Sequence, residues 1–181
     1  MRYGKPNDWE EWERNFPPGV EIPEPFIHFM EEGHFLYPGE LEIRNFYYQI
    51  PVMKHILKDK RSVRLVIFGA CADGSMYAFW RYDRQPIAQT PIVYWASEQA
   101  GSRVIANSFV EFLSLLGSGQ FECNRIYQDQ AVISELKSQR FCDWLQNDLG
   151  VAPVENAEDS IKTAGSNHPN FEQWLLAKME E

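Results

Sequence analysis

The sequence predicts an α+β fold, with a single, mostly antiparallel sheet and helices packed chiefly on one face of it. Three observations lead to this prediction. Short β-branched and aromatic runs follow one another between residues 63 and 106, separated by turn signals. Apolar residues at helical spacing occupy the chain on either side of these runs. Strands and helices are therefore segregated along the chain, whereas parallel strands would need crossover helices between them.

Two short helices are expected before the sheet. Asn7 is placed to cap the first, whose apolar face would carry Trp9 and Trp12. The second is expected at residues 22–32, where Gly33 stands at the position that commonly ends a helix. If exposed, the tryptophan face would be an anchor for a partner, but such a face more commonly packs on the body of the protein.

The central sheet is expected from four runs, at residues 63–68, 76–82, 92–95 and 103–106. Asp73-Gly74 between the first two runs is a strong hairpin signal. Pro91 can open the third strand without spoiling its ladder. Upstream, residues 40–48 predict a further strand and residues 52–58 one or two helical turns.

A helix rich in Phe and Leu follows the last strand. Asn107 or Ser108 caps it, and Glu111 stands three residues after Ser108, as in a capping box. Its apolar face holds Phe109, Phe112, Leu113 and Leu116. We expect this face to be buried against the sheet.

The remaining chain is expected to be mainly helical. Residues 131–149 predict one long amphipathic helix, and the polar residues 151–168 predict a loop. Asn170 is placed to cap a last helix. Residues 121–130 favour no single element.

At 181 residues the chain is expected to form one domain, large enough to bury a hydrophobic core. We divide it into an N-terminal helical extension (1–21), a core (22–116) and a C-terminal helical part (117–181). No run approaches the ~18 apolar residues that span a bilayer, and the N-terminus lacks the apolar stretch of a signal peptide. We therefore expect a cytoplasmic protein that does not enter a membrane.

The chain is acidic, with a formal net charge of −9. Such a charge repels phosphate backbones, so direct binding of nucleic acid is not expected. It suits a basic protein partner, including a nuclease. The alternative is that the charge serves solubility alone, as in many cytoplasmic proteins.

The motifs of metal and cofactor sites do not occur in the sequence. The three cysteines, Cys71, Cys123 and Cys142, lack the CxxC spacing of a zinc site. His28 and Glu32 are an i,i+4 pair but do not belong to an HExxH motif. There is no GxGxxG and no P-loop. We expect no metal, no cofactor, and reduced, partly buried thiols.

The sequence also offers no assembled catalytic site. Ser75 and Ser97 do not stand in a GxSxG turn. Asp73 and Glu98 are expected in turns at opposite ends of sheet strands and could perform acid–base chemistry only if the fold brought them together. Asp73 has a sufficient structural reason, because Asp before Gly is typical of a turn. A hydrolase using Asp73, Glu98 or a histidine is the main alternative to a binding protein.

Four segments carry a family resemblance when they are taken in order. They are IPEPFIHFMEEG (22–33), GACADGSMYAFW (69–80), PIVYWASE (91–98) and VIANSFVEFLSLL (104–116). This order of a helix ending in Gly, an Asp-Gly turn, a Pro-initiated strand and a Phe- and Leu-rich helix resembles the SUKH superfamily. That superfamily includes fungal cell-wall-synthesis regulators and many bacterial immunity proteins. One departure is SEQAGSR, which lacks the glycine that often follows Ser-Glu directly.

The resemblance implies an α+β fold and no enzymatic activity. It also implies a bacterial immunity protein, or antitoxin, that binds and neutralises a cognate toxin, often a nuclease. A housekeeping interaction scaffold without a toxin partner is a further alternative. No oligomeric state follows from the sequence.

A partner is expected to bind the loops of the sheet, because recognition residues usually lie on loops held by a rigid scaffold. We predict one rim formed by the Asp73 turn, the loop at 83–90 and the turn at 97–101. Asp73, Asp83 and Glu98 would supply negative charge there, with Tyr82 as an aromatic anchor. The rival site is the N-terminal helix of Trp9 and Trp12.

Overall fold

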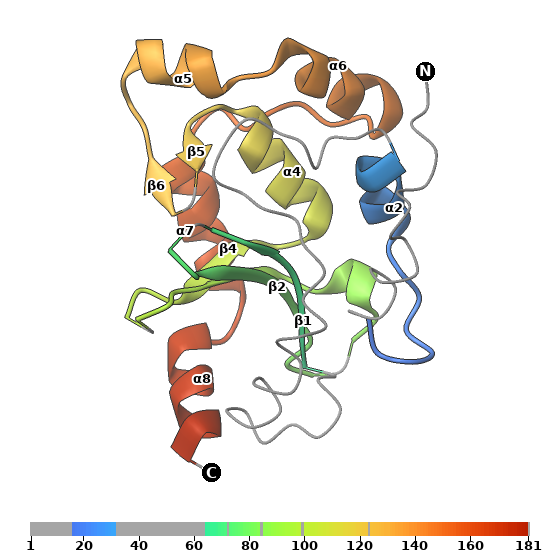
Figure 1. Ribbon diagram of the computed structural model, residues 1–181, viewed down its shortest axis with the longest axis vertical. Helices are drawn as coiled ribbons and strands as arrows, with labels where there is room; N and C mark the ends of the chain where they lie inside the picture. Colours follow the sequence, from blue (N-terminus) through green and yellow to red (C-terminus); the bar gives the residue numbers. More distant parts are fainter. Residues whose placement is uncertain are drawn as a thin grey trace.

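The computed structural model describes residues 16–31, 64–71, 73–83, 85–98, 100–122 and 124–180. Three predicted elements lie outside these residues: the first helix with Trp9 and Trp12, the strand at 40–48 and the turns at 52–58. Figure 1 shows the described elements as a central sheet with helices above and below it. Within the described residues, no helix combines the length and the apolar composition that spanning a bilayer requires.

The sheet is an antiparallel meander in the order β1-β2-β3-β4. Its strands are β1 (Leu65–Ala70), β2 (Met76–Trp80), β3 (Ile92–Trp95) and β4 (Arg103–Ala106). Successive side chains of β2 point to opposite faces, so Tyr77 and Phe79 belong to one buried cluster and Ala78 and Trp80 to another. The predicted α+β class and its antiparallel sheet are confirmed, and both faces of the sheet are covered.

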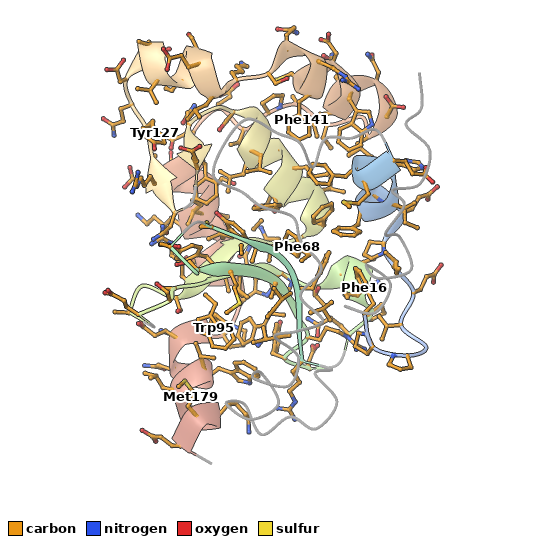
Figure 2. All side chains as sticks on the ribbon, viewed as in Figure 1. Phe16, Phe68, Trp95, Tyr127, Phe141 and Met179 are labelled. Carbon is orange, nitrogen blue, oxygen red and sulfur yellow. The ribbon has the colours of Figure 1, made fainter. Side chains whose placement is uncertain are left out.

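Among the described residues, the helices that cover the first face are chiefly α2 (Glu24–Glu31), α4 (Phe109–Gly117) and α6 (Gln139–Asp148). Aromatic rings join these helices to the strands. The Phe68 ring lies 5.4 Å from that of Phe109 and 5.6 Å from that of Phe112, in both cases edge to face. Phe26 of α2 reaches Phe109 at 5.3 Å. Figure 2 shows Phe68 and Phe141 in this layer.

The predicted cap of α4 is confirmed. The Ser108 hydroxyl accepts a hydrogen bond from the backbone N–H of Glu111 at 3.2 Å. The Glu111 carboxylate in turn accepts one from the backbone N–H of Asn107 at 3.3 Å. The first contact satisfies a donor that the first turn of a helix otherwise leaves unpaired, and the second pairs the N–H of the residue just before the cap.

The second face is covered by α8 (Phe171–Glu180) and the end of α7 (Ala157–Asn167). The Trp80 ring packs against Phe171 at 5.0 Å and Trp174 at 5.3 Å, and Figure 2 shows Trp95 and Met179 on this side. Asn170 caps α8 as predicted, accepting from the Gln173 N–H at 3.0 Å. Helices α2, α4 and α6 lie on the first face as expected, whereas α8 lies on the second face and α7 contributes to both.

Helix α7 stands where the sequence was expected to form a loop, so that prediction is wrong. The Asn156 side chain caps it by accepting from the Asp159 N–H at 3.1 Å. Ala157 and Ile161 belong to the buried cluster of the first face, and Ala164 to that of the second. Helix α7 packs along β4, the last strand of the sheet, and crosses its edge from one layer to the other (Figure 1).

The long helix predicted at 131–149 is interrupted. The structure has α5 (Gln130–Leu136) and α6 instead, separated by the extended Lys137, with φ −76° and ψ 115°. The Ser138 hydroxyl caps α6 by accepting from the Phe141 N–H at 3.4 Å. Ser favours a helix start over a helix interior because its side chain bonds to the nearby backbone. Upstream, β5 (Phe121–Glu122) and β6 (Arg125–Ile126) form a small hairpin.

Residues from all three predicted segments of the chain meet in one buried cluster. Phe16, Phe79 and Trp144 all belong to it, and the Phe16 ring lies 6.0 Å from that of Phe79. A shared core is what a single domain requires. The division at residues 1–21, 22–116 and 117–181 stays a prediction.

Candidate functional site

The meander places its two tight turns at the same end of the sheet. The β1–β2 turn carries Asp73 and the β3–β4 turn carries Glu98, and both residues are exposed. The expectation that these two turns lie at opposite ends is wrong, because the first and third connections of an antiparallel meander share one end. A hydrogen bond of 3.1 Å from the Ser97 N–H to the Ser75 hydroxyl joins the two turns. We call this end, with the described residues 73–75, 97–98 and 100–101, the hairpin end.

The β2–β3 connection lies at the opposite end, because an antiparallel meander alternates its connections. It carries Tyr82 and Asp83, which therefore do not join Asp73 and Glu98. The four residues predicted to form one rim thus lie on two separate surfaces. A partner that contacts Asp73 and Glu98 therefore does not need to contact the surface of Tyr82 and Asp83.

The Asp73 carboxylate has a structural task in its turn. Its Oδ1 atom accepts a hydrogen bond from the Ser75 N–H at 2.8 Å, and Gly74 takes φ 85°, which favours glycine. Because the carboxylate has two oxygens, this contact leaves part of its acceptor capacity for a partner. Glu98 is exposed at the neighbouring turn.

Tyr82 is half-buried and packs on the second face of the sheet. Its ring lies 4.8 Å from that of Trp80, and its hydroxyl lies 3.3 Å from Nδ1 of His168. Asp83 is exposed, and its Oδ1 atom accepts from the Gln85 N–H at 3.1 Å. Tyr82 therefore holds the junction between α7 and α8 in place.

His168 connects this junction to the start of α4. Its Nε2 lies 3.2 Å from the amide oxygen of Asn107, whose nitrogen donates to Glu111 at 2.7 Å. Since an amide oxygen only accepts, Nε2 carries the proton, and Nδ1 accepts from the Tyr82 hydroxyl. Burial lowers the pKa of His168, although the nearby carboxylates of Glu111 and Asp83 act in the opposite direction. The neutral imidazole fits this set of hydrogen bonds.

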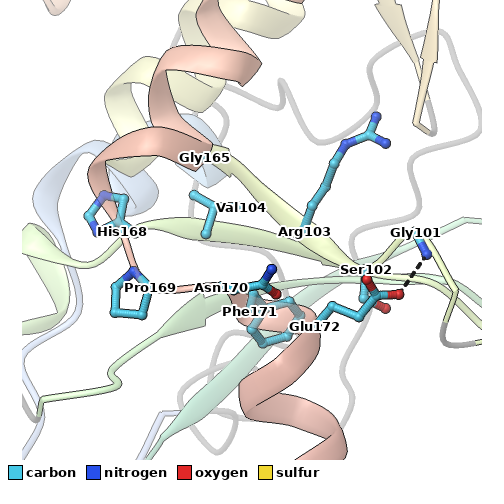
Figure 3. Close-up of a pocket in the computed structure, with 10 residues that line it drawn as sticks. All are labelled: Gly101, Ser102, Arg103, Val104, Gly165, His168, Pro169, Asn170, Phe171 and Glu172. Carbon is cyan, nitrogen blue, oxygen red and sulfur yellow. Dashed lines mark hydrogen bonds between the residues drawn. The ribbon is translucent and has the colours of Figure 1, made fainter.

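A cavity of about 380 Å³ lies beside β4, between the β3–β4 turn and the α7–α8 junction (Figure 3). Its described lining includes Ser102, Gly165, Asn170 and Glu172. The Gly101 N–H donates to Oε1 of Glu172 at 3.2 Å, which ties the turn to the first turn of α8. None of the four residues predicted as a partner site belongs to this lining. The cavity could not be predicted, because one of its walls is the unexpected helix α7.

The described lining offers no nucleophile with an adjacent base. Both ring nitrogens of His168 are engaged, and the Ser102 hydroxyl accepts from the Ala96 N–H at 3.0 Å. Over the part of the chain that the structure describes, no three His, Cys, Asp or Glu side chains converge as metal ligands. Cys71 and Cys142 are buried, and burial raises the pKa of the Cys142 thiol.

The comparisons with known proteins give a family. The model of the SMI1 / KNR4 family (SUKH-1) matches residues 4–115, which is more than half of the chain. This match includes all of β1 to β4 and most of α4, and it ends before α5. Searches of curated proteins and of solved structures found no match. The resemblance drawn from the sequence is thereby confirmed: the chain belongs to the SMI1 / KNR4 family (SUKH-1).

Proposed function

We propose that this protein is a bacterial immunity protein, which binds a cognate toxin in the cytoplasm and neutralises it without catalysis. Membership of the SUKH-1 family is the observation that carries the proposal. The net charge of −9 supports a basic toxin, such as a nuclease, because opposite charges speed the encounter of two proteins.

We place the toxin on the hairpin end. Asp73 and Glu98 are exposed on two turns that a hydrogen bond joins, so their charges act on the same partner surface. Tyr82 and Asp83 form a second, separate candidate at the other end of the sheet. This second surface is the weaker candidate, because the ring of Tyr82 already packs against Trp80 and its hydroxyl already contacts His168.

The test is co-purification with the toxin encoded next to this gene. Asp73→Asn keeps an oxygen for the Ser75 N–H, so it removes charge without removing the turn contact. Combined with Glu98→Lys, it should weaken toxin binding at least ~10-fold, as expected for charged interface contacts. The matched control is Asp148→Asn with Glu180→Lys, which changes the net charge equally at exposed positions elsewhere.

Two outcomes would contradict the placement. If the hairpin-end variant and the control lose the same affinity, only net charge matters. If binding survives in the hairpin-end variant but is lost in Asp83→Asn or on deletion of residues 1–15, which keeps the buried Phe16, the site is the opposite end or the N-terminal segment. A neighbouring toxin that the unmodified protein does not bind would overturn the immunity function itself.

A further inference from the structure

We propose that a groove on the C-terminal part of the chain binds a segment of the protein partner in which a lysine or arginine stands next to an apolar residue. The groove lies between α5, β6 and the start of α7, and its volume is about 250 Å³. This inference deepens the proposed function and rests on it for the identity of the partner. It gives the toxin a second contact besides the hairpin end.

Helix α5 brings apolar side chains to the groove that the core does not bury. None of its seven residues is buried, although Val132, Ile133 and Leu136 are apolar. A helix of a globular protein usually buries its apolar side against the core. Ile133 lines the groove together with Ile126 of β6 and Tyr127, and these three side chains are half-buried. They form an apolar surface that a partner can cover.

The described lining of the groove is negatively charged. It contains Glu155 and Glu158 and includes no Lys, Arg or His. Both glutamates are exposed. Within the described residues neither carboxylate forms a hydrogen bond or an ion pair, not even with Lys162 one turn after Glu158. Two unpaired carboxylates beside apolar side chains complement a cation that adjoins an apolar group.

The start of α7 does not turn the groove into a site for anions. The Ala157 N–H donates to Oε1 of Gln120 at 3.1 Å, and the Asp159 N–H donates to Oδ1 of Asn156 at 3.1 Å. Two N–H groups of the first turn are therefore already paired. Glu158 and Asp159 also place two carboxylates in this turn, which offset the positive end of the helix. The groove thus favours a cation.

Hydrogen bonds of Gln120 hold the walls of the groove in place. Its Nε2 donates to the Glu155 carbonyl at 2.8 Å, while its Oε1 accepts from the Ala157 N–H. The backbone N–H of Tyr127 donates to the Gln120 carbonyl at 2.8 Å, and the Tyr127 hydroxyl donates to Glu122 at 3.1 Å. The groove is therefore formed before a partner arrives, which lowers the ordering cost of binding.

The size and the position of the groove favour a protein segment as its ligand. Its volume lies below the range of small-molecule sites, ~300–1,000 Å³, and suits one side chain. The family model ends at residue 115, before every residue of the described lining, so the groove lies outside the region that the family shares. In the view of Figure 1, α5, β6 and the turns of the hairpin end all lie toward the left of the molecule, as contacts of a single partner require.

The first test uses a synthetic peptide and no toxin. We expect acetyl-Ala-Lys-Leu-Arg-Ala-amide, titrated into the ¹⁵N-labelled full chain, to shift the amide signals of Gln120, Ile126 and Ile133 in a saturable way. The same peptide with Ser in place of Leu should bind at least ~3-fold more weakly, because it has no apolar side chain to bury. Equal binding of the two peptides would show attraction by charge alone and would overturn the groove.

The second test removes the two charges of the lining. Glu155→Gln with Glu158→Gln keeps the size of both side chains and should weaken binding of the Leu peptide at least ~5-fold, as expected for the loss of two exposed ion pairs. The matched control is Asp148→Asn with Glu180→Gln, which changes the net charge equally at exposed positions outside the described lining. If both double variants lose the same affinity, the response reports net charge and the inference fails.

The third test concerns the apolar part of the groove. Ile133→Ala should weaken binding of the Leu peptide at least ~3-fold, because the peptide loses its apolar contact on α5. Val132→Ala, a half-buried position of α5 outside the described lining, is the control and should bind as the unmodified chain does. Alanine improves the helix propensity of both positions, so neither substitution is expected to unfold α5. Equal binding in the two variants contradicts the groove.

These results separate the two proposals. Peptide binding that depends on Glu155, Glu158 and Ile133 supports the groove even where the neighbouring toxin does not bind the unmodified chain, and in that case the immunity function alone fails. A toxin that binds the unmodified chain, and binds Glu155→Gln with Glu158→Gln equally well, leaves the immunity function standing and contradicts the groove as a contact of the toxin.

Discussion

At the residue scale, His168 should make stability depend on pH. Its folded-state pKa is lowered, chiefly by burial, from the ordinary value of about 6.5. Between the two pKa values the unfolded chain binds more protons than the folded one, so the free energy of unfolding falls as the pH drops below about 6.5. His168 therefore contributes to the free energy of unfolding above that pH, and this contribution is lost on acidification.

His168→Gln isolates this effect, because an amide can still donate to Asn107 and accept from Tyr82. Urea unfolding at about pH 7.5 and about pH 5.5 should show a larger loss of stability in the unmodified chain than in this variant. His28→Gln, on the surface of α2, is the control and should leave the larger loss in place. Equal losses in the unmodified chain and His168→Gln would show that His168 does not set the response.

At the scale of the element, the packing of the first face of the sheet depends on α4. Phe112 is fully buried and its ring lies 5.3 Å from that of Tyr77 and 5.6 Å from that of Phe68. Phe112→Ala should therefore lower the free energy of unfolding by ~3–5 kcal/mol. Denaturant unfolding measures this, with Val110→Ala on the partly exposed side of α4 as the comparison. A loss below ~1 kcal/mol would mean that α4 does not anchor the sheet.

The elements that the sequence predicts well are those with local signals. The Asp73-Gly74 turn, the Ser108 cap and the β-branched runs each act over a few residues, and the structure has a turn, a helix start and strands there. Helix α7 was missed because its buried face consists of Ala157, Ile161 and Ala164 in otherwise polar surroundings. Only its packing against β4 makes so small an apolar face sufficient.

In the candidate site, too, the sequence predicts the features that local residues determine and misses those that depend on the packing of distant segments. That Asp73 and Glu98 are exposed in turns can be read from the sequence, because turn residues are locally specified. Which turns share an end follows from the order of the strands, and it separates both residues from Tyr82 and Asp83. The cavity that contains Glu172 depends on three elements meeting, so no local pattern predicts it.

For the whole molecule, the net charge of −9 predicts a salt-dependent encounter with a basic toxin. Raising salt from about 0.05 M to about 0.5 M shortens the screening length and should slow association. The hairpin-end variant, Asp73→Asn with Glu98→Lys, should associate more slowly at low salt, and its rate should converge with that of the unmodified chain at high salt. Stopped-flow mixing measures both rates. A deficit that persists at high salt would indicate lost contacts instead of lost steering.

The covering of the second face also has a consequence for biosynthesis. All four strands leave the ribosome before the residues of α7 and α8, since these helices follow the sheet in the chain. During that interval Trp80, Val93 and Trp95 present an apolar surface with its C-terminal cover still unmade. Nascent chains with such surfaces are the ones that chaperones hold and that aggregate when synthesis stalls. A stop or pause in translation between β4 and α8 therefore leaves this face of the sheet open to misfolding and aggregation.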